Sequence, residues 1–161
     1  MTALTEPGSP VWDQSPPKFR RHQSTSVIGR GDELWQSATE ALLRWEVKTR
    51  SGFDVPGAHP VVAGEQLEIL VHLGPFRIRE PIEVVEVVHT ADRVGFAYRT
   101  RPGHPVDGEE AFVLSRVGDV VTITLRSLTR RSTTRAWALV FPVLRLAQLG
   151  VRRRYRRVLR G

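Results

Sequence analysis

The sequence contains no cysteine, so disulfide bonds, thiolate metal ligands and a thiol nucleophile are all excluded. A chain without cysteine is typical of a reducing compartment. The N-terminus also lacks the basic start and the apolar run of a secretory signal peptide. We therefore expect a cytoplasmic protein.

Acidic residues are missing from the last part of the chain, after Asp119. All seventeen acids and thirteen of the 24 Lys and Arg residues precede Val120, and the other eleven, all arginines, follow. The overall charge of +7 is thus divided into −4 before Val120 and +11 after it. A polyanionic partner would therefore dock at the C-terminal part rather than over the whole surface.

Several catalytic and cofactor motifs are absent as well. There is no Gly-x-Ser-x-Gly nucleophile turn, and Gly29-Arg30-Gly31 lacks the third glycine of a dinucleotide-binding loop. The five histidines are scattered without the spacing of metal ligands. We predict neither a metal nor another cofactor.

A length of 161 residues with 40% hydrophobic residues fits one globular domain. Residues 1–18 carry four prolines and little periodicity, so we expect a mobile N-terminal arm there, with Trp12 pinned to the surface. Residues 19–161 should form a single domain.

The period of the apolar residues changes twice along this domain. A helical stripe from Asp32, the expected N-cap, runs to about residues 48–52, and a loop follows to Gly64. Alternation with period two then predicts successive antiparallel strands up to Leu125, with a hairpin turn at Val117-Gly118-Asp119 and a break near Pro81. Residues 137–159 return to a helical stripe, interrupted by Pro142. The expected fold is α+β: a curved antiparallel sheet of about six or seven strands gripping a long C-terminal helix, with one N-terminal helix. This order resembles the helix-grip arrangement of START-like and birch-pollen-allergen-like domains.

The densest polar segment supports a closer resemblance. It reads Phe96-Ala97-Tyr98-Arg99-Thr100-Arg101-Pro102-Gly103-His104-Pro105-Val106-Asp107-Gly108-Glu109-Glu110-Ala111-Phe112. This resembles the signature Phe-x-Tyr-Gly-Thr-Leu-Pro-Gly-His-Pro-x-x-Gly-Glu-Glu-x-Phe of the domain-of-unknown-function family numbered nineteen-ninety. Matches flanking the segment extend the resemblance over about residues 19–160; they are Gly29, Gly31, Trp45, Gly64, Pro142 and Gln148. It implies a fold and an important segment, but no reaction, because the family has none assigned.

The sequence departs from this pattern at two places. Arg99 and Arg101 stand where the family has Gly and Leu, and Thr129-Arg130-Arg131 stands where Ser-Arg-Pro is usual. The two arginines put a charged rim beside the signature, so a ligand inferred for other members need not carry over.

The residues of the signature allow three interpretations. Phe96, Tyr98 and Thr100 share one face of a strand, whereas Glu109 and Glu110, as neighbours on a strand, point to opposite faces. The segment is a structural latch, the polar end of a ligand cavity, or an acid/base site that uses His104 and a glutamate. The candidate ligand-binding residues are Tyr98, Thr100, His104, Glu109, Glu110, Trp137 and Phe141.

The C-terminal stretch is a candidate polyanion surface. Wound as a helix, its arginines separate from a stripe of Val151, Tyr155 and Leu159, and the candidate binding residues are Arg152, Arg153, Arg156 and Arg157. A solvated helix face, a helix lying on an anionic membrane and a nucleic-acid contact all fit this pattern. Nucleic acid is disfavoured, because no aromatics are interleaved with the arginines apart from Tyr155.

The combined prediction is non-catalytic binding of an apolar small molecule or lipid, in a cavity between the sheet and the C-terminal helix. The alternative is a peripheral membrane or polyanion adaptor that acts through the arginine-rich helix. An enzyme with His104 and a glutamate as acid and base is the third hypothesis.

Overall fold

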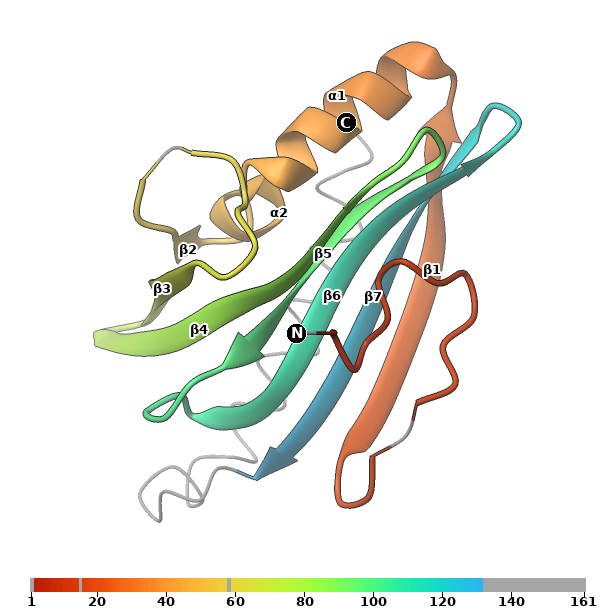
Figure 1. Ribbon diagram of the computed structural model, residues 1–161. Helices are drawn as coiled ribbons and strands as arrows, with labels where there is room; N and C mark the ends of the chain where they lie inside the picture. Colours follow the sequence, from red (N-terminus) through yellow and green to blue (C-terminus); the bar gives the residue numbers. More distant parts are fainter. Residues whose placement is uncertain (1, 15, 58, 132–161) are drawn as a thin grey trace.

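A computed structural model describes residues 2–14, 16–57 and 59–131 of the chain. One curled antiparallel sheet of seven strands forms its body, in the order β1-β7-β6-β5-β4-β3-β2, and two helices pack against it (Figure 1). The strands are β1 (Arg20–Arg30), β2 (Phe53–Asp54), β3 (Gln66–Leu73), β4 (Phe76–His89), β5 (Arg93–Thr100), β6 (Val106–Val117) and β7 (Val120–Arg131). The helices are α1 (Asp32–Leu43) and α2 (Glu46–Thr49). The predicted C-terminal helix, with Trp137, Phe141 and the arginines of residues 152–157, lies outside the described residues.

The predicted meander is confirmed. Strands β3 to β7 follow one another in the sheet, and β6 and β7 join through the expected turn at Gly118-Asp119. The first strand returns to pair with the last, Ser24 opposite Leu125, which makes β1 one edge of the sheet. Figure 1 shows that the sheet is curled towards the side on which α1 and α2 pack.

The N-terminal helix differs from its prediction at both ends. Asp32 is its first residue rather than its N-cap; Gly31 holds that position, and Asp32 pairs with Arg116 at 2.7 Å. Instead of one helix to residues 48–52, α1 ends at Leu43, and α2 begins after Trp45, whose φ of 65° is left-handed. The apolar stripe continues through this break and therefore does not reveal it.

The sheet is more continuous than the sequence indicates. Strand β4 runs without interruption through Pro81, where a break was predicted, and β2 lies within the expected loop. The carbonyl of Pro81 accepts a hydrogen bond from the backbone N of Arg101, and the N and C=O of one strand residue point to the same side. The missing N–H of Pro81 thus faces the carbonyl of Arg101, just after the end of β5, and that carbonyl accepts instead from the N–H of His104 at 3.1 Å.

The two faces of the sheet carry separate apolar clusters. The inner face, which we define by Phe96, Tyr98 and Phe112, packs with α1 and α2 into the main core. The outer face, defined by Val85, Ala97, Ala111 and Val113, forms a smaller cluster with Ala3.

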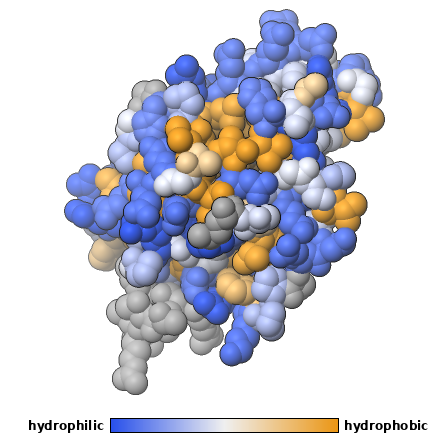
Figure 2. All heavy atoms as spheres, in the orientation of Figure 1, coloured by the Kyte–Doolittle hydropathy of each residue, from blue (hydrophilic) through white to orange (hydrophobic). Residues whose placement is uncertain are grey.

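The N-terminal segment lies across the outer face, in front of β6 and β7 in Figure 1. Trp12 is buried there and its indole N–H donates to the carbonyl of Leu4 at 2.9 Å. On this side of the molecule, apolar residues gather near the centre and hydrophilic residues surround them (Figure 2). These contacts are those of a packed segment; the mobility expected for residues 1–18 stays a prediction that amide exchange would test.

Candidate functional site

The signature segment occupies the end of β5, the following loop and the start of β6. Its first role is to close this loop: the hydroxyl of Thr100 accepts from the N–H of Gly108 at 2.9 Å and donates to the carbonyl of Gly108 at 3.2 Å. Gly103 turns the chain with a left-handed φ of 97°. At Gly108 a Cβ would lie 1.9 Å from the carbonyl oxygen of Leu128, so only glycine lets β6 approach β7 there. These residues form a structural latch.

Glu109 points to the outer face and holds the N-terminal segment. Its side chain is 2% exposed, and its carboxylate accepts from the backbone N of Thr5 at 2.7 Å and from the Thr5 hydroxyl at 2.6 Å. Arg99, one of the two departures from the family signature, pairs with the same carboxylate at 3.3 Å. Of the two adjacent glutamates, Glu109 is therefore fully occupied away from the inner face.

Glu110 points the opposite way, as predicted for neighbouring strand residues. The Tyr98 hydroxyl donates to Oε2 of Glu110, and Nζ of Lys48 lies 3.4 Å from the same oxygen. Tyr98 lies directly opposite Glu110 in the register of β5 and β6, so the sheet itself brings the two together. The result is a phenol, a carboxylate and an ammonium group on an otherwise apolar surface.

Lys48 is the most unusual member of this group. Its side chain, 4% exposed, projects from α2, and Nζ lies 4.5 Å from the ring centre of Phe53, 5.0 Å from Tyr98 and 5.7 Å from Phe112. Rings attract a cation through their negatively charged faces. Burying a charge is costly, and these rings and Glu110 offset part of that cost.

His104 pairs with a glutamate that the sequence analysis did not consider. Its Nδ1 accepts from the N–H of Val106 at 3.0 Å, which requires a neutral ring with its proton on Nε2. That nitrogen lies 3.7 Å from Oε2 of Glu80. Burial by itself would raise the pKa of Glu80, but the hydrogen bond from His104 and the positive charge of Lys48 hold that pKa below its usual value. An ionised Glu80 therefore lies at the edge of the same polar group.

Two members of this inner polar group, Lys48 and Glu80, were missed from the sequence. Lys48 lies seven residues after Ala41 and three after Trp45, so it falls on the apolar stripe of the predicted helix, where a charged residue is unexpected. Glu80 has the same parity as Ile82 and Val84, both buried on the inner face. In each case, the signal that could have revealed the residue was a charged side chain at a position that the apolar pattern predicts to face inward.

The candidate residues from the sequence thus separate into three groups. Tyr98 and Glu110 meet on the inner face, while Thr100 and His104 serve the loop and Glu109 serves the outer face. Trp137, Phe141, Arg152, Arg153, Arg156 and Arg157 lie outside the described residues. Within residues 2–131, apart from the two undescribed positions in that range, no His, Asp and Glu side chains cluster in a way that could hold a metal ion. Neither helix in that part of the chain is long and apolar enough to cross a membrane.

Solved structures with the same fold come from bacteria and plants. A hypothetical protein from Helicobacter pylori shares 10% identity with a TM-score of 0.59, covering 87% of this chain and 85% of its own. The major latex-like protein 151 of Panax ginseng shares 11% identity with a TM-score of 0.52, covering 84% and 94%. A point mutant of norcoclaurine synthase from Thalictrum flavum, in complex with a transition-state analogue, shares 13% identity with a TM-score of 0.53, covering 88% and 93%. At such identities the likeness shows the fold alone, which is the helix-grip type.

Sequence comparisons give the family. A protein described as UPF0548 from Deinococcus radiodurans is 29% identical over 143 residues, which are 80% of this chain and 71% of that protein. The family described as a domain of unknown function, DUF1990, matches residues 4–158, nearly the whole chain. The resemblance seen in the signature segment is thereby confirmed, and the chain belongs to the DUF1990 family.

Proposed function

We propose that this protein binds a small, mainly apolar molecule against the inner face of its sheet, without catalysing a reaction. The observation that carries the proposal is the polar group of Lys48, Tyr98 and Glu110, buried among aromatic rings. Ligand sites combine an apolar lining with a few polar groups that fix orientation. A cation retained in such a place costs stability, and natural proteins keep such costs mainly at functional sites.

The fold supports the same proposal by analogy. Norcoclaurine synthase of Thalictrum flavum, at 13% identity and a TM-score of 0.53, has also been crystallised with dopamine and hydroxybenzaldehyde. Both are small aromatic molecules with polar substituents. We propose that the cavity here lies between the inner face and the predicted C-terminal helix.

Binding of a neutral apolar dye tests this function. We expect N-phenyl-1-naphthylamine to bind with increased fluorescence, and to shift the NMR methyl signals of Val84 on the inner face. Val85 is the matched control, because it is the next residue and is also buried, but on the outer face. Absence of dye binding, together with no molecule retained in native mass spectra of the purified protein, would contradict the proposal. Methyl shifts confined to Val85 and Val113 would contradict it equally.

Two other functions stay predictions. An acid/base enzyme built on His104 would use Glu80, since Glu109 and Glu110 are engaged elsewhere. A membrane or polyanion adaptor would act through residues outside the described part, and the uneven distribution of charge along the sequence favours it.

A further inference from the structure

Trp45, at the break between α1 and α2, combines two costly features. Its φ of 65° and ψ of 12° are left-handed, a conformation that helix ends normally assign to glycine. Its side chain is 1% exposed, yet its indole N–H has no hydrogen-bond partner among the residues that the structure describes. A buried donor without a partner is destabilising, and so is a bulky residue with positive φ.

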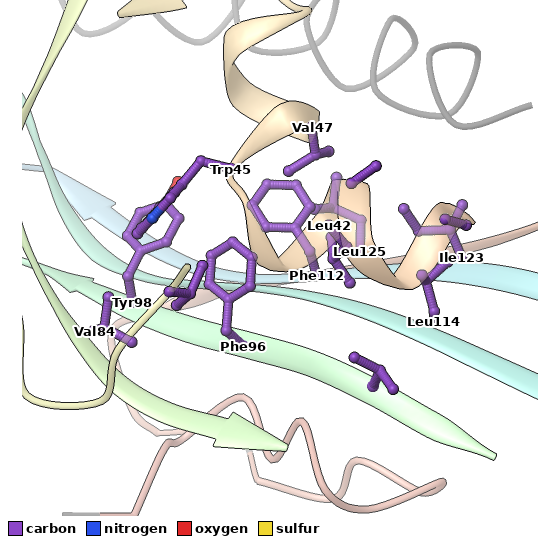
Figure 3. Packing of buried hydrophobic residues seen from close by; sticks show 14 of the residues in the cluster. Leu42, Trp45, Val47, Val84, Phe96, Tyr98, Phe112, Leu114, Ile123 and Leu125 are labelled. Atoms are coloured by element: carbon purple, nitrogen blue, oxygen red, sulfur yellow. The ribbon is translucent and has the colours of Figure 1, made fainter. Parts of the chain in front are cut away.

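The indole ring lies among the aromatic side chains of the proposed ligand site. Its centre is 4.8 Å from that of Phe96, in an edge contact, and 6.3 Å from that of Tyr98. Figure 3 shows Trp45 beside these two residues of β5. The backbone carbonyl of Trp45 also accepts from the N–H of Lys48 at 2.8 Å, so the break that places Trp45 also places Lys48. Flat apolar walls and one free donor fit an aromatic molecule that carries a hydrogen-bond acceptor.

The charges nearby decide what kind of acceptor fits. Lys48 is the one cation of the inner polar group as the structure describes it, and it already pairs with Glu110. Glu80 adds a second carboxylate, and the ring of His104 is neutral because its Nδ1 accepts a hydrogen bond. With two carboxylates for one ammonium group, an additional anion would be repelled. A neutral oxygen is therefore favoured over a carboxylate.

From this geometry, and resting on the proposed function, we infer that Trp45 is a ligand-binding residue whose indole N–H donates to a neutral carbonyl or ether oxygen on an aromatic ligand. The class of ligand is thus an uncharged aromatic compound with one oxygen acceptor. Fatty acids and other carboxylates should bind more weakly at this position, because they would face two carboxylates.

Three naphthalenes of similar size test the inference: 2-acetylnaphthalene, 2-ethylnaphthalene and 2-naphthoate. In the full-length protein we expect the ketone to bind well, the carboxylate weakest, and the Trp45 indole N–H proton signal to move downfield only with the ketone. Trp45→Phe keeps an aromatic ring and removes the donor. This substitution should weaken binding of the ketone about tenfold relative to binding of the hydrocarbon, which is the usual contribution of one hydrogen bond. The measured quantity is the ratio of the dissociation constants of these two neutral compounds.

Trp35→Phe is the matched control, because Trp35 is a buried tryptophan in the first turn of α1 that packs against Arg116, whereas Trp45 follows the end of that helix. It should leave the ratio unchanged. If the ketone and hydrocarbon ratio is the same in wild type and Trp45→Phe, the inference fails while apolar binding stands. Should Trp45→Phe not fold, an unshifted Trp45 N–H signal in ketone-saturated wild type overturns it. If none of the three compounds binds, this inference and the proposed function fail together.

Discussion

Glu80 illustrates how single residues on the inner face depend on their neighbours. Its side chain is 15% exposed and lies beside the proton-bearing nitrogen of His104. Burial would raise the pKa of Glu80, but the hydrogen bond from His104 and the charge of Lys48 together lower it below the ordinary value of 4.5. Its ionised form is therefore more stable in the folded than in the unfolded chain.

The lowered pKa of Glu80 determines the direction in which the stability of the fold changes with pH. A carboxylate with a lowered folded-state pKa contributes stability above its unfolded pKa, and this contribution is lost as the pH falls through the folded value. We expect wild type to lose stability on acidification below about pH 4.5, and Glu80→Gln to lose less while starting from a lower stability at pH 7. Urea midpoints at pH 7 and at a pH below about 4.5 measure this loss of stability. Glu40→Gln, at an exposed position of α1, should keep the wild-type slope; a Glu80→Gln slope equal to that of wild type would contradict the expectation.

The pattern of the sequence reveals only some of these residues. That Glu109 and Glu110 face opposite sides followed from the geometry of a strand alone. The sequence does not show as directly that Lys48 and Glu80 join Tyr98 and Glu110 in the inner polar group. Their meeting depends on which strand and which helix come together in space. Trp45 fits the apolar stripe of the predicted helix, so its left-handed backbone left no trace in the periodicity.

Among the elements, the N-terminal segment is held by contacts that its sequence does not reveal. Many of its contacts are made by its backbone: Arg126, 1% exposed, donates to the carbonyls of Thr5 at 3.1 Å, Glu6, Ser9 at 3.0 Å and Pro10 at 3.2 Å. Burial and the nearby charge of Arg93 lower the pKa of Arg126 to about 10, so it remains charged at neutral pH. Because backbone carbonyls accept the bonds, the side chains of the segment need no periodicity. A sequence pattern therefore cannot predict this docking, whereas it predicted the meander of β3 to β7.

A pair of Thr→Val substitutions tests how much this segment stabilises the fold. Thr5→Val keeps the shape and the backbone bond to Glu109 but removes the hydroxyl bond, and should lower the free energy of unfolding by about 1.5–3 kcal/mol, the range for bonds to charged groups. Thr39→Val in α1 is the matched control, since its buried hydroxyl has no partner within the described residues. Removing an unpaired polar group is neutral or stabilising. Urea denaturation of both variants measures the difference, and equal stabilities would show that the bond from the Thr5 hydroxyl to Glu109 adds little.

At the scale of the whole molecule, the sheet divides two kinds of interaction. The inner face holds aromatic rings and a compact polar group, and the outer face holds small apolar residues beneath a segment fixed by arginines. In β5 and β6, Tyr98 lies opposite Glu110, and Arg99 lies opposite Glu109. The first pair contributes to the inner face and the second pair to the outer face. In this chain, the signature segment therefore contributes contacts to both faces of the sheet.

The uneven charge of the chain makes the adaptor alternative testable. If Arg152, Arg153, Arg156 and Arg157 form a docking surface, association with anionic vesicles must weaken steeply with salt, because surface charges are screened beyond about 8–10 Å at physiological ionic strength. Replacing Arg152, Arg153, Arg156 and Arg157 by Gln should abolish this association and leave the free energy of unfolding within about 0.5 kcal/mol of wild type, as for surface substitutions in general. Vesicle co-sedimentation at low and high salt measures the first effect, and vesicles of neutral lipid provide the control. If the protein binds nucleic acid and this binding also weakens steeply with salt, the partner of the surface would be nucleic acid rather than a membrane. Wild-type protein that associates with neither at low salt would mean that these arginines only solvate the chain, and the adaptor function would then be abandoned.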